Sequence, residues 1–172
     1  MTCAGPNMRH QTGVGLLEVL IALLILAIGA LGYAGLQLTA LRNSDDANYR
    51  AHAAMIAQDA IERIKSNPAA ADQYATAANW PASAGSSSPA DWKRCMNGAC
   101  NAAQLAEWDM KQLVWAVSTT MPGGRIIAQD CGFNALDCVI VSWGEQVPAE
   151  CIGNGGIDSS DDSSCLVMEV VR

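Results

Sequence analysis

The sequence has few charged residues and very few aromatic rings. Charged side chains make up 16% of the 172 residues and aromatic side chains 5%, with a single Phe. The 51% hydrophobic content nevertheless excludes an intrinsically disordered chain, so Ala, Leu, Ile and Val must supply the apolar mass. This length fits one modest domain with an appendage and leaves no room for a multidomain enzyme.

Basic residues are also scarce. The chain has 10 Lys and Arg against 17 Asp and Glu, which gives a formal net charge of −7. This is the wrong sign for a protein that binds a phosphate backbone, so we expect no nucleic-acid partner.

Motifs for catalysis and metal binding are missing too. The sequence contains no P-loop, nucleophile elbow or dinucleotide fingerprint, and it has no C-x-x-C pair. The two histidines, His10 and His52, lie far in sequence from the late cysteines, which disfavours zinc. We therefore expect no catalytic residue, no metal site and no cofactor. Two alternatives stay open: a dithiol oxidoreductase built on Cys95 and Cys100, and calcium binding by the acidic segment GNGGIDSSDDSSC, with Asp158, Asp161 and Asp162.

Cysteine, by contrast, is abundant. Six of the seven cysteines lie in the second half of the chain: Cys95, Cys100, Cys131, Cys138, Cys151 and Cys165, with Cys3 apart from them. An even number in an exported domain predicts three disulfides, and short loop closure favours bonds between sequence neighbours over the other connectivities. Free or redox-active thiols are the alternative.

One long segment carries no charge at all. Residues 19–41, between Glu18 and Arg42, include the run VLIALLILAIGALGYAGLQL. As a helix rising about 1.5 Å per residue it would measure roughly 35 Å, enough to cross a bilayer core of about 30 Å. A cleaved secretory signal is the alternative, but its apolar region is shorter and ends in a small-residue cleavage site.

The helix is predicted to continue beyond the apolar segment. Apolar residues recur there at three- and four-residue steps opposite a charged face: Tyr49, Ala53, Ile56, Ala57, Ala60, Ile61 and Ile64. Asn67 and Pro68 end the pattern. This predicts one helix from Val14 to about Ser66, apolar all round at first and then amphipathic.

The remaining residues predict a mixed head. An irregular connector is expected over 68–90, and a second helix over 101–121 with Leu105, Trp108 and Trp115 near one apolar face, widened by Met110, Leu113, Val114 and Val117. Strands are expected at 125–129, 138–143 and 166–171. The predicted fold class is therefore α+β, a long N-terminal helix with a distal antiparallel sheet.

The N-terminal residues carry a family resemblance. A polar leader ending in RHQTG, followed by VGLLEVLIALLIL, resembles the class III signal of type IV prepilins. In that family an aspartyl peptidase cuts after the glycine and usually methylates the new N-terminus, and a Glu is the fifth residue after the cut. The resemblance implies that Gly13 ends the leader, that Val14 begins the mature chain, and that Glu18 is the fifth residue. Because Val14 stands where Phe or Met is usual, its methylation stays open.

The resemblance also implies a role for Glu18. A new α-amine on Val14 and the Glu18 carboxylate lie near one end of an apolar helix, and neither charge is tolerable alone inside a packed helical bundle. Pairing between neighbouring subunits would neutralise both, which makes Glu18 an assembly determinant. Gly29, Gly32 and Gly35 are small residues suited to close helix contact.

The whole chain has the order of a type IV pilin. The Trp-Asp, short helix and Pro-Gly-Gly signature at 108–124, together with GLLEVLIALLILAIGALG, is most similar to PilV-type minor pilins. This implies a leader at 1–13, a membrane and assembly half at 14–41, an amphipathic half at 42–66 and a disulfide-bearing head at 67–172.

The function implied is that of a minor pilin, a structural subunit that helps prime pilus assembly and sits at or near the tip, in adhesion and twitching motility. Implied partners are other minor pilins, the major pilin, prepilin peptidase and the inner membrane, with a tip adhesin as a further candidate. The subunit would span the inner membrane once, with its N-terminus cytoplasmic and its head periplasmic, before joining the pilus at the cell surface. A pseudopilin of a type II secretion system is the rival, and a membrane-anchored periplasmic thiol protein a third alternative.

Overall fold

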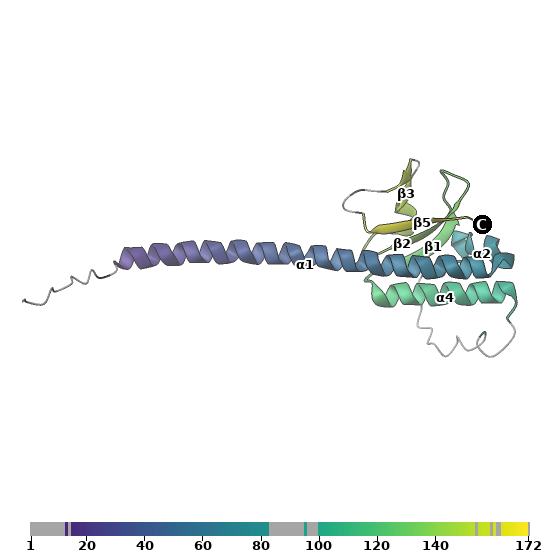
Figure 1. The fold of residues 1–172 in the computed structure, drawn as a ribbon, viewed down its shortest axis with the longest axis horizontal. Helices are drawn as coiled ribbons and strands as arrows, with labels where there is room; N and C mark the ends of the chain where they lie inside the picture. Colours follow the sequence, from purple (N-terminus) through teal and green to yellow (C-terminus); the bar gives the residue numbers. More distant parts are fainter. Residues whose placement is uncertain are drawn as a thin grey trace, which may run out of the picture. The chain divides into compact units, whose positions relative to one another are not determined.

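A computed structural model describes residues 13, 15–82, 95, 100–153, 155–158, 160 and 163–171. The chain divides into two compact units, Met1–Ser44 and Asp45–Arg172, and one helix, α1 (Leu16–Ser66), contributes to both (Figure 1). A long N-terminal helix followed by an antiparallel sheet confirms the predicted α+β fold class. The leader residues 1–12, Cys3 among them, and Val14 lie outside the described residues.

The two parts of α1 differ in burial. Every described side chain of residues 15–44 is exposed, whereas Ala53, Ala57, Ala60 and Ile64 are buried in the second unit. These four lie at three- and four-residue steps, as the amphipathic pattern predicts. The helix ends where Asn67 N–H donates to the Ile64 carbonyl at 3.2 Å and Pro68 follows.

The start of the expected connector is more ordered than the composition predicts. It forms three short helices, η1 (Pro68–Ala70), α2 (Ala71–Tyr74) and η2 (Ala77–Asn79). Tyr74 and Trp80 are buried, and Trp80 Nε1–H donates to the Tyr74 carbonyl at 2.7 Å. Two large rings therefore anchor a segment otherwise rich in Ala, and the prediction of an irregular connector is wrong for 68–80. Residues 83–90 lie outside the described part of the chain.

The second predicted helix is α4 (Ala102–Thr120). Asn101 begins it with a capping box: its side chain accepts from Gln104 N–H at 2.9 Å, and Gln104 Oε1 accepts from Asn101 N–H at 3.1 Å. The buried stripe comprises Ala106, Asp109, Met110, Leu113, Val114 and Val117. The four residues predicted to widen the apolar face are therefore buried, whereas Leu105 and Trp108 are half-buried and Trp115 is exposed, so the prediction is wrong only in centring the face on those three.

Three strands form the main sheet in the order β1-β2-β5, with both pairs antiparallel. They are β1 (Arg125–Asp130), β2 (Asp137–Ser142) and β5 (Cys165–Val170), each within one residue of its predicted bounds. A short helix η4 (Pro148–Glu150) and a two-stranded sheet of β3 (Ile152–Gly153) and β4 (Gly156–Ile157) were not predicted.

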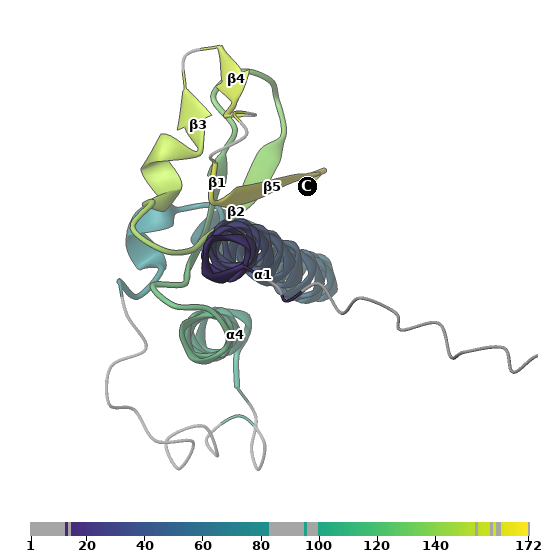
Figure 2. The ribbon, with the colours of Figure 1, turned by 90° about the vertical axis from the view of Figure 1, so that its left-hand side faces the viewer.

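The two faces of the main sheet bury different cores. In Figure 2 the sheet and α4 lie on different sides of the second half of α1. Ile126, Val139 and Val141 belong to a helix-side core with the buried residues of α1 and α4. The opposite face belongs to a disulfide-side core of Cys131, Cys138, Ile140, Cys151 and Cys165. All six residues of β2 are buried, and the four between its polar ends, residues 138–141, form the apolar run that predicted a strand here.

Candidate assembly helix and head surface

The apolar part of α1 has no cover from its own chain. Among the described residues, α1 is the helix long and apolar enough to cross a membrane, and none of its apolar window is buried. Leu17, Leu24 and Leu31 expose 69%, 61% and 75% of their surface. Burying such side chains is worth about 1.5–3 kcal/mol each, so this surface demands lipid or another protein.

Glu18 lies in the first turn of this helix. Its backbone N–H donates to the Gly15 carbonyl at 3.0 Å, and a carboxylate at this end interacts favourably with the helix dipole. Within the described part of the chain, no cation lies within ion-pair distance of the Glu18 carboxylate. Gly13 is described and exposed, whereas Val14, the predicted source of the amine, is outside the described residues.

Three glycines interrupt this apolar surface. A Cβ built on Gly29, Gly32 or Gly35 would meet no other atom within 4 Å. Nothing in the described fold therefore requires glycine at these positions, and each lowers helix stability by about 1 kcal/mol relative to Ala. Small residues at this spacing suit close approach of a helix from outside this chain.

The six late cysteines form three disulfides in the structure. The bonds join Cys95 to Cys100, Cys131 to Cys138, and Cys151 to Cys165. The second and third are buried in the disulfide-side core, whereas Cys95 and Cys100 are half-buried. Bonded sulfurs are neither thiol nucleophiles nor zinc ligands, and the described residues contain no cluster of three candidate metal ligands.

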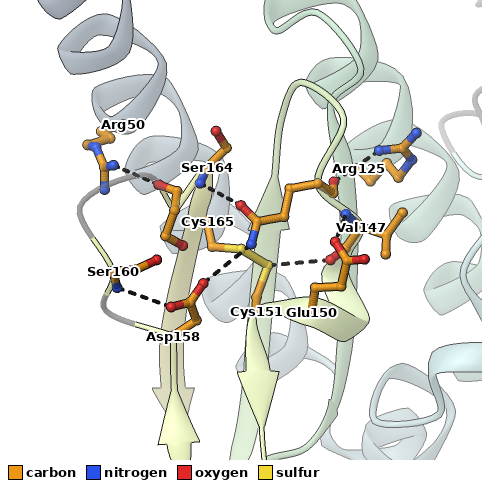
Figure 3. The surroundings of a disulfide bond; sticks show 11 residues. Arg50, Arg125, Val147, Glu150, Cys151, Asp158, Ser160, Ser164 and Cys165 are labelled. Atoms are coloured by element: carbon orange, nitrogen blue, oxygen red, sulfur yellow. Dashed lines mark hydrogen bonds between the residues drawn. A yellow bond between two sulfur atoms is a disulfide. The ribbon is translucent and has the colours of Figure 1, made fainter.

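The bond between Cys151 and Cys165 closes an acidic segment (Figure 3). Asp158 N–H donates to the Cys151 carbonyl at 2.9 Å, and the Asp158 carboxylate accepts from Ser160 N–H at 3.1 Å and from Gln146 Nε2 at 3.4 Å. The pKa of Asp158 is lowered, chiefly by the hydrogen bond that its carboxylate accepts from the Ser160 N–H. Asp161 and Asp162 lie outside the described residues, and calcium binding stays a hypothesis.

A polar network that the sequence did not indicate joins α1, α2 and α4. Asp109, only 4% exposed, accepts from Arg63 Nη1 at 2.8 Å and from the Tyr74 hydroxyl at 2.6 Å. Asn67 Nδ2 donates to the Ala102 carbonyl at 2.8 Å and the Tyr74 hydroxyl at 3.4 Å. Burial and the bond to Asp109 raise the pKa of Tyr74 above its usual range. One signal was available: Asp109 falls on the apolar stripe of α4, where a charge needs a partner.

The Pro-Gly-Gly turn connects α4 to β1 by close backbone packing. Gly123 has φ +65°, and a Cβ there would collide with the Gly144 carbonyl oxygen. A Cβ on Gly124 would lie 2.5 Å from the Val117 carbonyl oxygen. Gly144 N–H also donates to the Pro122 carbonyl at 2.7 Å. The motif therefore holds the end of α4 against the turn that follows β2.

Comparisons with known proteins point to one family. Residues 35–111 match the model of the Tt1218-like family, described as type IV pilin Tt1218. Residues 8–34 match the prokaryotic N-terminal methylation motif, which includes Gly13 and Glu18. No curated protein and no solved structure matches the chain. The adjoining matches, together with the long helix and antiparallel sheet, show that this chain belongs to the type IV pilin superfamily.

Proposed function

We propose that the protein is a minor pilin of the PilV type, which helps prime assembly of the type IV pilus and sits at or near its tip. Membership of the superfamily, a class of structural proteins, already implies interaction with other pilins and with prepilin peptidase. The Pro-Gly-Gly signature and the disulfide-bearing head favour the pilus over a type II secretion system. Adhesion and twitching motility are the activities to which such a subunit contributes.

One observation carries the assembly role: the apolar half of α1 is exposed throughout and begins with a single carboxylate. A bilayer covers this surface before assembly, and helices of neighbouring pilins cover it in the filament. An unpaired carboxylate is costly in such a bundle, so Glu18 pairs with the α-amine of Val14 on a neighbouring subunit.

The proposal divides the chain by task. Residues 1–13 are the leader, 14–41 the membrane and assembly half of the helix, 42–66 its amphipathic half and 67–172 the head. Cleavage after Gly13 removes the leader and leaves Val14 as the first residue. The head is periplasmic while the helix anchors the subunit in the inner membrane, and it reaches the cell surface with the pilus.

Processing is tested by intact mass. In cells that contain the peptidase, we expect a mature chain beginning at Val14 and lacking Cys3, with or without one added methyl group. Retention of Met1 in those cells would contradict the assignment of the leader.

Deleting the gene separates the pilus from secretion. We expect loss of surface pili and of twitching motility, while secretion through the type II system stays at the wild-type level. The opposite pattern, in which pili persist and secretion fails, would identify the protein as a pseudopilin. Complementation with the intact gene is the control.

A further inference from the structure

The three disulfides differ in how accessible their sulfur atoms are. Cys95 and Cys100 are half-buried and belong to neither of the two cores that the structure describes. The other four cysteines expose between 0% and 7% of their surface: Cys131, Cys138, Cys151 and Cys165. A thiolate must reach a sulfur atom to break a disulfide, so accessibility decides which bond exchanges in the folded protein. The bond between Cys95 and Cys100 is the one open to this attack.

Loop length does not separate this bond from the nearest of the buried ones. The bonded cysteines are 5 positions apart for Cys95 and Cys100, and 7 apart for Cys131 and Cys138. Loops of such similar size have nearly the same closure entropy. The two bonds are therefore a matched pair that differs in burial. Reduction of the bond at Cys131 requires the core to open first, whereas reduction at Cys95 does not.

The first turn of α4 is held by contacts other than this disulfide. Cys100 directly precedes Asn101, whose side chain accepts from Gln104 N–H at 2.9 Å and caps the helix. Asn67, at the end of α1, donates from Nδ2 to the Ala102 carbonyl at 2.8 Å. These hydrogen bonds do not involve sulfur. The start of α4 therefore keeps its cap and its link to α1 when the disulfide opens.

We propose that the bond between Cys95 and Cys100 is a redox-responsive site of the folded head. A protein dithiol reduces this bond, a protein disulfide restores it, and the two buried bonds stay intact through both steps. In the oxidised state Cys95 is tied to the residue before α4, and its Sγ lies 3.9 Å from the Gln104 carbonyl oxygen. In the reduced state this tie is lost while the head stays folded. The inference does not depend on the minor-pilin role.

The proposed exchange is a two-electron reaction in two steps. A thiolate of the dithiol attacks one sulfur of the bond between Cys95 and Cys100, and the other sulfur leaves as a thiolate and takes up a proton. The second thiol of the reductant loses its proton and attacks the mixed disulfide, which releases the remaining cysteine. Cys95 and Cys100 end as thiols and the reductant ends as a disulfide. The reverse sequence, with a protein disulfide as the oxidant, restores the bond.

The first test measures which bond is reduced first in the full chain, in detergent. Thiols that are free at the start, Cys3 among them where the leader is retained, are blocked with iodoacetamide. Dithiothreitol or thioredoxin is then added as the dithiol, and new thiols are labelled with N-ethylmaleimide and located by peptide mapping. We expect Cys95 and Cys100 to be labelled at least about tenfold faster than Cys131 and Cys138. Equal rates, or faster labelling of a buried pair, would overturn the proposal.

The second test measures whether the head stays folded when the bond is open. In the double variant Cys95→Ser with Cys100→Ser, we expect cooperative thermal unfolding with a midpoint within about 10 °C of the wild type. Cys131→Ser with Cys138→Ser is the matched control, since it removes a loop of similar size from the disulfide-side core, and we expect a larger drop there. Loss of cooperative unfolding in the first variant, or equal drops in both, would show that the bond is structural and would contradict the proposal.

The third test measures reversibility in cells. Cells treated with increasing dithiothreitol are quenched with acid, and their thiols are labelled and mapped as before. We expect Cys95 and Cys100 to become thiols at concentrations that leave Cys151 joined to Cys165, and to be joined again after the reductant is washed out. Simultaneous reduction of all three bonds, persistence of the accessible bond while a buried one opens, or failure to restore it would each refute a redox-responsive site.

Discussion

The two parts of α1 form one continuous helix, but only the second part packs into the head. Residues 16–44 bury no described side chain, whereas Asp45 to Ser66 contributes Ala53, Ala57, Ala60 and Ile64 to the head. The first part is apolar on all sides and has no stripe to face a core of its own. The second part has one stripe of small residues, which lets other elements approach closely.

This difference shows where each part finds its partner. Apolar residues on every side of a helix indicate that the cover comes from outside the chain, either lipid or other helices. A narrow stripe indicates cover from the same chain. Changes in the first part should therefore alter assembly and leave the head unchanged, and changes in the second part should do the reverse.

The largest effect is expected for Glu18→Ala. If Glu18 pairs with the Val14 amine of a neighbouring subunit as proposed, its loss leaves that amine unpaired in the bundle, so we expect incorporation into pili to fall by about tenfold or more. Among the described residues, none before Tyr49 belongs to the cores of the head, so the unfolding of the head should match the wild type. Immunoblots of sheared pili and denaturation of the full chain measure the two quantities. Glu62→Ala, an exposed acid in the second part of α1, is the control, and normal incorporation of Glu18→Ala would count against the role.

The second-largest effect is expected in the polar network of the head. Asp109→Ala removes the buried carboxylate that accepts from the Tyr74 hydroxyl and from Arg63. Among the described residues, Arg63 then keeps one ion pair, the exposed one with Asp59. We expect the free energy of unfolding to fall by about 3 kcal/mol. Glu107→Ala, an exposed acid two residues away, should cost less than about 0.5 kcal/mol. Equal losses in denaturant titrations would show that the network does not stabilise the head.

The disulfides should also differ in how much they stabilise the head. Closing a loop of about 15 residues is worth roughly 3 kcal/mol in the chain-entropy model, against about 2 kcal/mol for a loop of about 6. Cys151 is also fully buried, whereas Cys95 is half-exposed. We expect Cys151→Ser to lower the stability of the head more than Cys95→Ser does. Peptide mapping without reductant checks the pairing, and a different partner for Cys151 or Cys165 would overturn this ranking.

A smaller effect depends on pH. Because burial raises the pKa of Tyr74 in the folded state, the folded protein holds this proton more tightly than the unfolded chain does. The free energy of unfolding should therefore fall as pH rises above about 10, the usual value for tyrosine. Tyr74→Phe should be about 1 kcal/mol less stable near neutral pH but should lose less between about pH 9 and 11. Tyr49→Phe is the control, and identical slopes for both variants would contradict the assignment.

The smallest effect on the head is expected for Gly32→Ala. A Cβ there meets nothing in the chain, so the head should unfold as in the wild type while incorporation reports any close helix contact. Gly124→Ala is the opposite case, since its Cβ would lie 2.5 Å from the Val117 carbonyl oxygen. We expect Gly124→Ala to destabilise the head, and a loss of head stability in Gly32→Ala would break the comparison between the two parts of α1.

The sequence predicted those features that a repeating pattern encodes. The apolar run predicted the first part of α1, the steps from Ala53 to Ile64 predicted the second, and the dense Val and Ile of β2 predicted a buried strand. These patterns are local, and each predicts its helix or strand from the residues of that element alone.

Features that depend on tertiary packing were missed. Tyr74 and Trp80 are single rings in a segment rich in Ala, so composition indicated a loop where the fold needed two anchors. Trp115 was placed near the centre of the apolar face of α4 but is exposed, because the buried stripe is centred on Val114 and Val117, which the pattern had included only at its edge. The pairing of Asp109 with Arg63 joins two helices far apart in the sequence, and no periodicity reports such a contact.

The disulfides also bear on how the protein matures. Each bond joins cysteines that are neighbours in the cysteine order, at sequence separations of 5, 7 and 14. No bond encloses another, so each loop closes without a cysteine from a later part of the chain. A polypeptide that emerges from a membrane with its N-terminal part first is therefore able to oxidise its loops one after another. The cysteines then become available in the same order in which they pair. No cysteine has to stay reduced until a more distant one has emerged.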